Sequence, residues 1–200
     1  MGRDYGRNET RGRIAHLAAR LMAEDGIEDY ALAKRKAARQ AGTPDARALP
    51  TNEEIDAALK LYRQIYQPDT HRERLRALRE TAVRAMREMI DFNPYLTGSV
   101  LNGNAGKYAD VNLQVFTDNP KSVELFFLDR GILYRAAQAR LYSGDELRIV
   151  PVLTISDDGV EIEVTVLSPR DLRVPLRTTA EGKAIERARL EAVEELLAQT

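Results

Sequence analysis

The sequence predicts an α+β protein, in which a helical N-terminal region precedes a mixed β-sheet with flanking helices. Apolar residues recur at helical spacing up to about residue 93, and again over the last thirty residues. From about residue 96 to 170 the pattern changes to the alternation of apolar and polar residues that is typical of strands. We therefore expect a helical region over residues 1–93 and a sheet domain closed by a terminal helix over residues 94–200.

The composition narrows the class of protein. Of the 200 residues 44% are hydrophobic, so the chain can bury a core, and the net charge of −1 does not indicate nucleic acid or membrane as a partner. The absence of cysteine excludes disulfides, Cys-based zinc sites and thiol nucleophiles. No apolar run approaches the roughly 20 residues of a membrane span. The polar N-terminus lacks the apolar core of a secretory signal, so we expect a cytoplasmic protein with no membrane partner.

Four helices are expected in the first region, after a mobile arm at residues 1–8. They are predicted over residues 9–25, 30–40, 51–66 and 69–91. Thr51 and Glu54 are spaced as a capping box at the start of the third helix. The second helix has a basic outer face, which makes a DNA-binding regulator acting through residues 9–50 a third functional hypothesis. Nucleic acid is not favoured as a partner, because acidic residues at the start of the next helix would repel phosphate.

The second region contains most of the predicted strands. They cover residues 94–100, 109–117, 132–141, 148–156 and 159–168. A short helix is predicted over residues 122–129 and a terminal helix over 180–199. Asp157-Asp158-Gly159 is a hairpin signal between the last two strands. In the strand over 109–117, alternation places Asp110 and Asn112 together on one face.

Residues suited to binding phosphates surround the start of this strand. Gly98 and Ser99 end the preceding strand and offer backbone N–H groups and a hydroxyl, and glycine allows a ligand to approach closely. Asn102 and Lys107 follow in the loop and can supply donors and one cation to a phosphate tail. The segment is therefore a candidate phosphate-binding site.

Oxygen-bearing side chains lie on two strands of the predicted sheet. Asp110 and Asn112 share a face of one strand, and Glu161 and Glu163 share a face of a later one. Either glutamate can face the first pair, because a shift in register by one residue exchanges the two faces. Oxygen ligands beside phosphate donors hold Mg²⁺ on a nucleotide in many proteins. The sequence thus predicts a site for a nucleoside triphosphate with Mg²⁺ or Mn²⁺.

The order of these residues resembles the nucleotidyltransferase superfamily related to DNA polymerase beta, over about residues 96–168. The shared pattern is Gly-Ser, a spacer near ten residues, Asp-x-(Asp/Glu) on a strand and an acidic residue on a later strand. The resemblance implies a nucleotidyltransferase-like sheet, in which Gly98 and Ser99 grip the triphosphate. It also implies that Asp110 and Glu163, or Glu161, hold two metal ions and catalyse transfer of a nucleotide to a hydroxyl acceptor, which the sequence does not identify.

Asn112 departs from the pattern, because the family has an acidic residue at this position. An amide oxygen can coordinate a cation but brings no negative charge, so at least one metal site is expected to be weaker. Two functions follow from this difference. The first is a Mg²⁺-dependent nucleotidyltransferase, and the alternative is a catalytically degenerate module that binds a nucleotide or a partner without turnover.

Two other chemistries lack their sequence patterns. A P-loop requires glycine at position 101 and Ser or Thr at 108, where Leu101 and Tyr108 stand. His16 and His71 are the only histidines, and both lie in the helical region. A Ser-His-Asp hydrolase is therefore not indicated, since no nucleophile-elbow motif surrounds Ser99.

Overall fold

The structure is a computed structural model in which the chain forms two compact units. It describes residues 2–27, 29–43, 49–66, 68–106, 108–180 and 182–199, without the side chains of residues 2–7, 64, 68 and 69. Unit 1 comprises residues 1–73 and 103–109, and unit 2 comprises residues 74–102 and 110–200. The chain therefore leaves unit 2 after Asn102 and returns to it at Asp110.

Unit 1 is built on three helices, α1 (Gly2–Glu24), α2 (Tyr30–Gln40) and α3 (Asn52–Tyr66). Both α2 and α3 pack against α1. The predicted capping box at the start of α3 is present. The Thr51 N–H donates to Glu54 Oε2 at 2.7 Å, and the Glu54 N–H donates to Thr51 Oγ1 at 3.3 Å. These bonds satisfy backbone donors that have no partner within the helix, and so fix where α3 begins.

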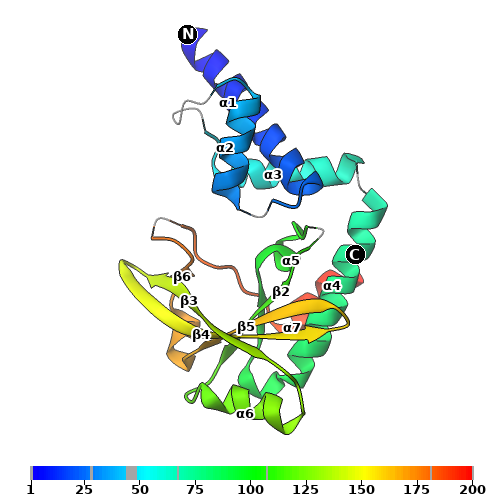
Figure 1. Cartoon of the computed structure of the whole chain (residues 1–200), viewed down its shortest axis with the longest axis vertical. Coiled ribbons are helices and arrows are strands. Elements are labelled where there is room, and N and C mark those ends of the chain that lie inside the picture. Colours follow the sequence, from blue (N-terminus) through cyan, green and yellow to red (C-terminus); the bar gives the residue numbers. More distant parts are fainter. Residues whose placement is uncertain are drawn as a thin grey trace. The chain divides into compact units, whose positions relative to one another are not determined.

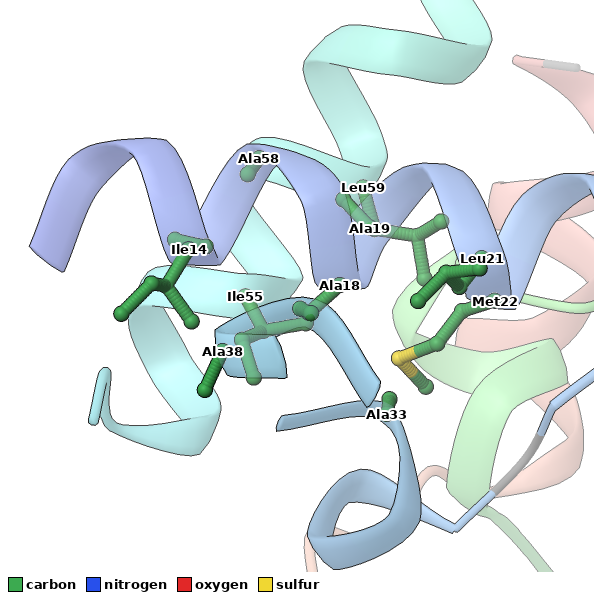
Figure 2. Close-up of a cluster of buried hydrophobic side chains, with 12 residues drawn as sticks. Ile14, Ala18, Ala19, Leu21, Met22, Ala33, Ala38, Ile55, Ala58 and Leu59 are labelled. Atoms are coloured by element: carbon green, nitrogen blue, oxygen red, sulfur yellow. The ribbon is translucent and has the colours of Figure 1, made fainter. Parts of the chain in front are cut away.

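The core of unit 1 is rich in alanine (Figure 2). Ile14, Ala18 and Met22 of α1 face Ala33 of α2 and Ile55 of α3, and all five are buried. Alanine leaves little side-chain volume between helix axes, so the three helices approach one another closely. This apolar core consists of residues from the three helices and their connections.

Residues 103–109 pack within unit 1 although they connect two elements of unit 2. His71 Nε2 lies 3.0 Å from the carbonyl oxygen of Gly103. The Tyr108 ring packs against Gly26, where an added Cβ would lie 3.2 Å from Tyr108 Cδ2. These contacts anchor the segment to the helical unit at both ends of its course.

Unit 2 contains a six-stranded mixed sheet in the order β1-β2-β5-β4-β3-β6 (Figure 1). The strands are β1 (Tyr95–Thr97), β2 (Val111–Phe116), β3 (Arg135–Ser143), β4 (Glu146–Asp157), β5 (Val160–Leu167) and β6 (Leu176–Arg177). β2 and β5 pair in parallel, and the other neighbours pair antiparallel. The predicted α+β class, with helices preceding a mixed sheet, is confirmed.

The helices of unit 2 are α4 (Pro68–Glu88, which starts in unit 1), α5 (Gly98–Asn102), α6 (Lys121–Asp129) and α7 (Leu190–Ala198). The buried side chain of Arg79 joins α4 to α5 and α7. Arg79 of α4 donates from Nε to the Val100 carbonyl at 3.3 Å and from Nη1 to the Leu196 carbonyl at 3.2 Å. These bonds hold α5 and α7 against α4 (Figure 1).

One face of the sheet is apolar across its central strands. Leu96, Leu113, Val164 and Leu153 oppose one another in register on four successive strands, and each is at most 1% exposed. The opposite face is divided into two ends. One end is apolar and covered, and the other carries polar side chains.

The covered end of this second face is packed under residues 169–187. Its buried cluster consists of Tyr95, Phe116, Leu141, Val150, Leu167 and Leu176. Leu172, Val174 and Ile185 of the covering segment pack against it. Arg187 then joins the segment to the sheet, donating from Nε to Gln114 Oε1 at 2.6 Å and from Nη1 to the Asp171 carbonyl at 3.1 Å.

Three predicted elements differ from the structure. The strand over residues 94–100 ends at Thr97, because Gly98 at φ 73° turns the chain into α5. The terminal helix begins at Leu190 instead of residue 180, because the preceding segment pairs with strands: the Ile185 N–H donates to Leu176, and Ala188 bridges Leu96. α1 begins at Gly2 and not at residue 9 as predicted, since extending an existing helix is easier than starting one, while the mobility of residues 1–8 stays a prediction.

Among the residues that the structure describes, none of the helices combines the length and the apolar character needed to cross a membrane.

Candidate functional site

A row of polar residues crosses the sheet at the uncovered end of the second face. Thr97 of β1 opposes Asn112 of β2, which opposes Glu163 of β5. Glu163 in turn opposes Thr154 of β4, and Thr154 opposes Arg135 of β3. We call these five residues the polar row. Adjacent strands lie about 4.8 Å apart, so each member is one strand spacing from the next.

The register separates the two candidate glutamates. Glu163 lies directly opposite Asn112. Glu161 lies two residues earlier on β5, on the same face, and its Oε1 accepts a hydrogen bond from Arg135 Nη2 at 2.5 Å. Glu163 is therefore the carboxylate beside the strand of Asp110 and Asn112 that has no such cation partner among the described side chains.

Charge repulsion and burial act on the carboxyls of this site. Burial raises the pKa of Asp110, and the charge of Glu161 raises it further. Burial also raises the pKa of Glu163, followed by the charges of Asp110 and Glu161. Arg135 opposes both shifts. Asp110 and Glu163 thus interact through space, and a cation between them would relieve their repulsion.

Gly98 approaches the side chain of Asn112 closely. Its φ of 73° lies in the left-handed region that favours glycine. A Cβ added at this position would lie 3.4 Å from Asn112 Nδ2. A side chain at position 98 would therefore contact Asn112, and glycine leaves the backbone of this turn without that contact.

Asn112 is held in place by two hydrogen bonds. Its Nδ2 donates to the Asp110 carbonyl at 3.4 Å, and Thr97 Oγ1 donates to the Asn112 carbonyl at 3.2 Å. With the amide nitrogen used in this way, Oδ1 is the atom that is suited to a cation. Asn112 can therefore supply an oxygen ligand but no charge.

The other residues predicted to bind phosphate are placed less closely. Ser99 is half-buried in the first turn of α5, and Asn102 is exposed at its end. Lys107 lies outside the described residues. The structure therefore brings Gly98, Asp110, Asn112 and Glu163 together, and leaves Asn102 at the edge of this group.

Three side chains of this site offer oxygen donors to a cation. Within the described part of the chain, no three His, Asp or Glu side chains are arranged to hold a metal ion. Two carboxylates and one amide oxygen remain, from Asp110, Glu163 and Asn112. Hard cations such as Mg²⁺ accept this mixture of ligands and complete their shell with water and phosphate oxygens. The arrangement does not fit the two metal ions that the resemblance implies, because Glu161 is occupied by Arg135.

Sequence reasoning missed Arg135, Thr97 and Thr154. Alternation within a strand assigns each residue to a face, but it does not say which strands are neighbours. β3 reaches the site only through β4, and that order depends on pairings far apart in the sequence. Arg135 lies inside the predicted strand 132–141, but nothing in that strand indicates which other strand its side chain reaches.

Comparison of the chain with family models, curated proteins and solved structures found no significant match. What can be said of function therefore depends on the residues and geometry described above.

Proposed function

We propose that unit 2 binds a nucleoside triphosphate with one divalent cation and transfers a nucleotide to a hydroxyl acceptor, as a nucleotidyltransferase-like protein. The observation that carries this proposal is the register Thr97–Asn112–Glu163, with Gly98 against Asn112 and Asp110 two residues away. In this register the Gly-Ser turn follows β1, Asp110 immediately precedes β2, and Glu163 of β5 lies opposite Asn112.

Each residue has a distinct part in binding. Asp110 and Glu163 would hold the cation with their carboxylates, and Asn112 with its amide oxygen. Gly98 and Ser99 would donate backbone N–H groups to the phosphates, whose approach a side chain at position 98 would obstruct. Bound Mg²⁺ would offset the negative charge that builds up on the phosphate oxygens during transfer.

The chemistry is a single displacement at the α-phosphorus. The acceptor oxygen forms a bond to the α-phosphorus. The bond between that phosphorus and the oxygen bridging to the β-phosphorus breaks, and pyrophosphate leaves. The proton of the acceptor hydroxyl would pass to the carboxylate oxygen of Glu163 that does not hold the cation. Holding acceptor and triphosphate together supplies the rest of the acceleration.

Calorimetric titration with ATP, CTP, GTP and UTP tests the proposal, each in Mg²⁺, in Mn²⁺ and in EDTA. We expect binding of at least one triphosphate that requires the cation and is lost in Asp110→Asn. Asp129→Asn is the matched control, because Asp129 is an exposed aspartate at the end of α6. Failure of all four to bind, or equal binding by Asp110→Asn, would reject the proposal.

Asn112 favours a second candidate, a module that binds nucleotide without turnover. The two candidates share the binding experiment and separate on products. A binding module would bind the triphosphate in the same cation-dependent way but release no pyrophosphate with any acceptor, and Asn112→Asp would strengthen cation binding. Release of pyrophosphate by the unaltered chain would exclude it.

A DNA-binding role for residues 9–50 gains no observation in its favour. Helix-turn-helix motifs join their two helices by a turn of about three or four residues. In unit 1 the connection between α2, ending at Gln40, and α3, beginning at Asn52, contains eleven residues. Steeply salt-dependent binding of duplex DNA by the full chain would be needed to revive this hypothesis.

A further inference from the structure

We infer that Arg135 takes the place of a second divalent cation in this site, by neutralising Glu161 and presenting its guanidinium to the triphosphate. The inference rests on the proposed function and specifies its charge arrangement. It makes this a site for one cation, with an arginine in the place of the second metal ion that the resemblance implies.

The position of Arg135 follows from the register of three strands. It is the first residue of β3 and opposes Thr154, which opposes Glu163. Its backbone is thus two strand spacings, about 10 Å, from that of Glu163, on the same face of the sheet. From there its side chain crosses β4 and reaches Glu161 on β5, with Nη2 at 2.5 Å from Oε1.

The charges of four side chains at the uncovered end of this face sum to a value that suits one cation. Asp110, Glu161 and Glu163 carry three negative charges when ionised, and Arg135 carries one positive charge. The remainder, −2, is what one divalent ion neutralises. With Glu161 occupied by Arg135, the ligands left for that ion are the carboxylates of Asp110 and Glu163 and the amide of Asn112.

Arg135 is also suited to bind phosphate. Its side chain is 71% exposed, so most of its guanidinium faces solvent on the open side of the sheet. Guanidinium groups offer five N–H donors and bind phosphate oxygens in pairs, and one nitrogen suffices for Glu161. Arg135 thus differs from Arg187, whose Nε and Nη1 donate hydrogen bonds that hold the covering segment against the sheet.

Removing the charge of Arg135 should change the affinities for Mn²⁺ and for inorganic triphosphate in opposite directions, whereas loss of folding would lower both. Arg135→Gln removes a positive charge near the cation, so affinity for Mn²⁺ alone should rise about threefold at low salt. The same change removes a charge-assisted hydrogen bond, so affinity for inorganic triphosphate in saturating Mg²⁺ should fall about tenfold. Arg140→Gln is the control, because Arg140 is an exposed arginine on the opposite face of β3.

Glu161→Gln provides a mirror test on the partner residue. It releases Arg135 from its ion pair, so affinity for inorganic triphosphate should rise, while affinity for Mn²⁺ alone falls slightly through the lost negative charge. The two variants should therefore move the two affinities in opposite directions.

Calorimetric titration of the full chain with MnCl₂, and separately with inorganic triphosphate in Mg²⁺, decides the question. Opposite changes in Arg135→Gln, absent from Arg140→Gln, support the inference. Changes of the same sign, or none, overturn it while leaving nucleotide binding by the unaltered chain intact. If the unaltered chain binds neither probe, the proposed function fails, and this inference fails with it.

Discussion

Asp171 and Asp110 lie against the same face of the sheet, at its two ends, and their surroundings differ. Asp171 is 3% exposed, pairs with Arg148 and accepts the Ser168 N–H at 3.0 Å. Asp110 is half-buried, and among the described residues its carboxylate accepts no hydrogen bond. The first arrangement holds the fold together. The second leaves a carboxylate with a raised pKa beside Glu163, which is typical of binding sites.

The same difference extends to the arginines of this face. Arg148 and Arg187 are committed to the covering segment at one end. Arg135 at the other end is largely exposed and pairs with a single carboxylate. One end of this sheet face therefore carries a polar network that holds the covering segment, and the other end carries the polar row.

Replacing Asp171 should have the largest effect on stability. Asp171→Ala leaves Arg148 without its partner and leaves the Ser168 N–H without its acceptor in the capping box of the 3-10 helix Pro169–Arg173, so we expect a loss of about 3 kcal/mol. Urea denaturation measures the free energy of unfolding. A loss below about 1 kcal/mol would show that the covering segment is held mainly by its apolar contacts.

Gly98→Ala should have an intermediate effect on stability and a marked effect on binding. An alanine at φ 73° costs about 1 kcal/mol, and its Cβ would enter the space beside Asn112. Gly131→Ala is a matched control, because Gly131 has φ 68° but no atom within 4 Å of an added Cβ. We expect similar losses of stability in both, and weaker triphosphate binding only in Gly98→Ala. Equal binding by both variants would argue against a ligand at α5.

Asp110→Asn should have the smallest effect on the free energy of unfolding, and this effect should be opposite in sign to that of Asp171→Ala. Folding raises the pKa of Asp110 and Glu163, so the native chain binds more protons than the unfolded chain at intermediate pH. The free energy of unfolding therefore falls as the pH rises from the ordinary carboxyl pKa through the raised values. Below the ordinary pKa this cost is absent.

Asp110→Asn removes part of that cost. It should stabilise the chain by less than about 1 kcal/mol at pH 7, because solvent screens the site, and should not stabilise it at pH 3. Urea denaturation at both pH values, compared with Asp129→Asn, measures the difference. A loss of stability at pH 7 would mean that Asp110 makes a favourable structural contact instead.

Local signals in the sequence predicted most elements of the fold. The capping box at Thr51 set the start of α3, and Asp157-Asp158-Gly159 joined two strands, with Asp158 and Gly159 at positive φ. Alternation placed Asp110 and Asn112 opposite the buried side of β2, where Val111 and Leu113 lie. Each of these signals acts over a few residues, so the sequence displays it directly.

The remainder depends on which strands become neighbours. β5 pairs in parallel with β2, although more than forty residues separate them. Only this pairing shows that Glu163 opposes Asn112, and only the place of β3 beyond β4 shows that Arg135 reaches Glu161. The prediction of a helix over residues 180–189 was wrong for a similar reason, because Ala188 pairs with Leu96, which lies far away in the sequence.

The course of residues 103–109 has a consequence for dissecting the protein. Because this segment belongs to unit 1, the chain passes between the units after Glu73, after Asn102 and before Asp110. A single cut near residue 93 would not yield an independent sheet domain, since Tyr108 would lose its contact with Gly26. Excising unit 2 intact requires a short artificial connection from Asn102 to Asp110, so that the two units are separable only by redesigning the link between α5 and β2.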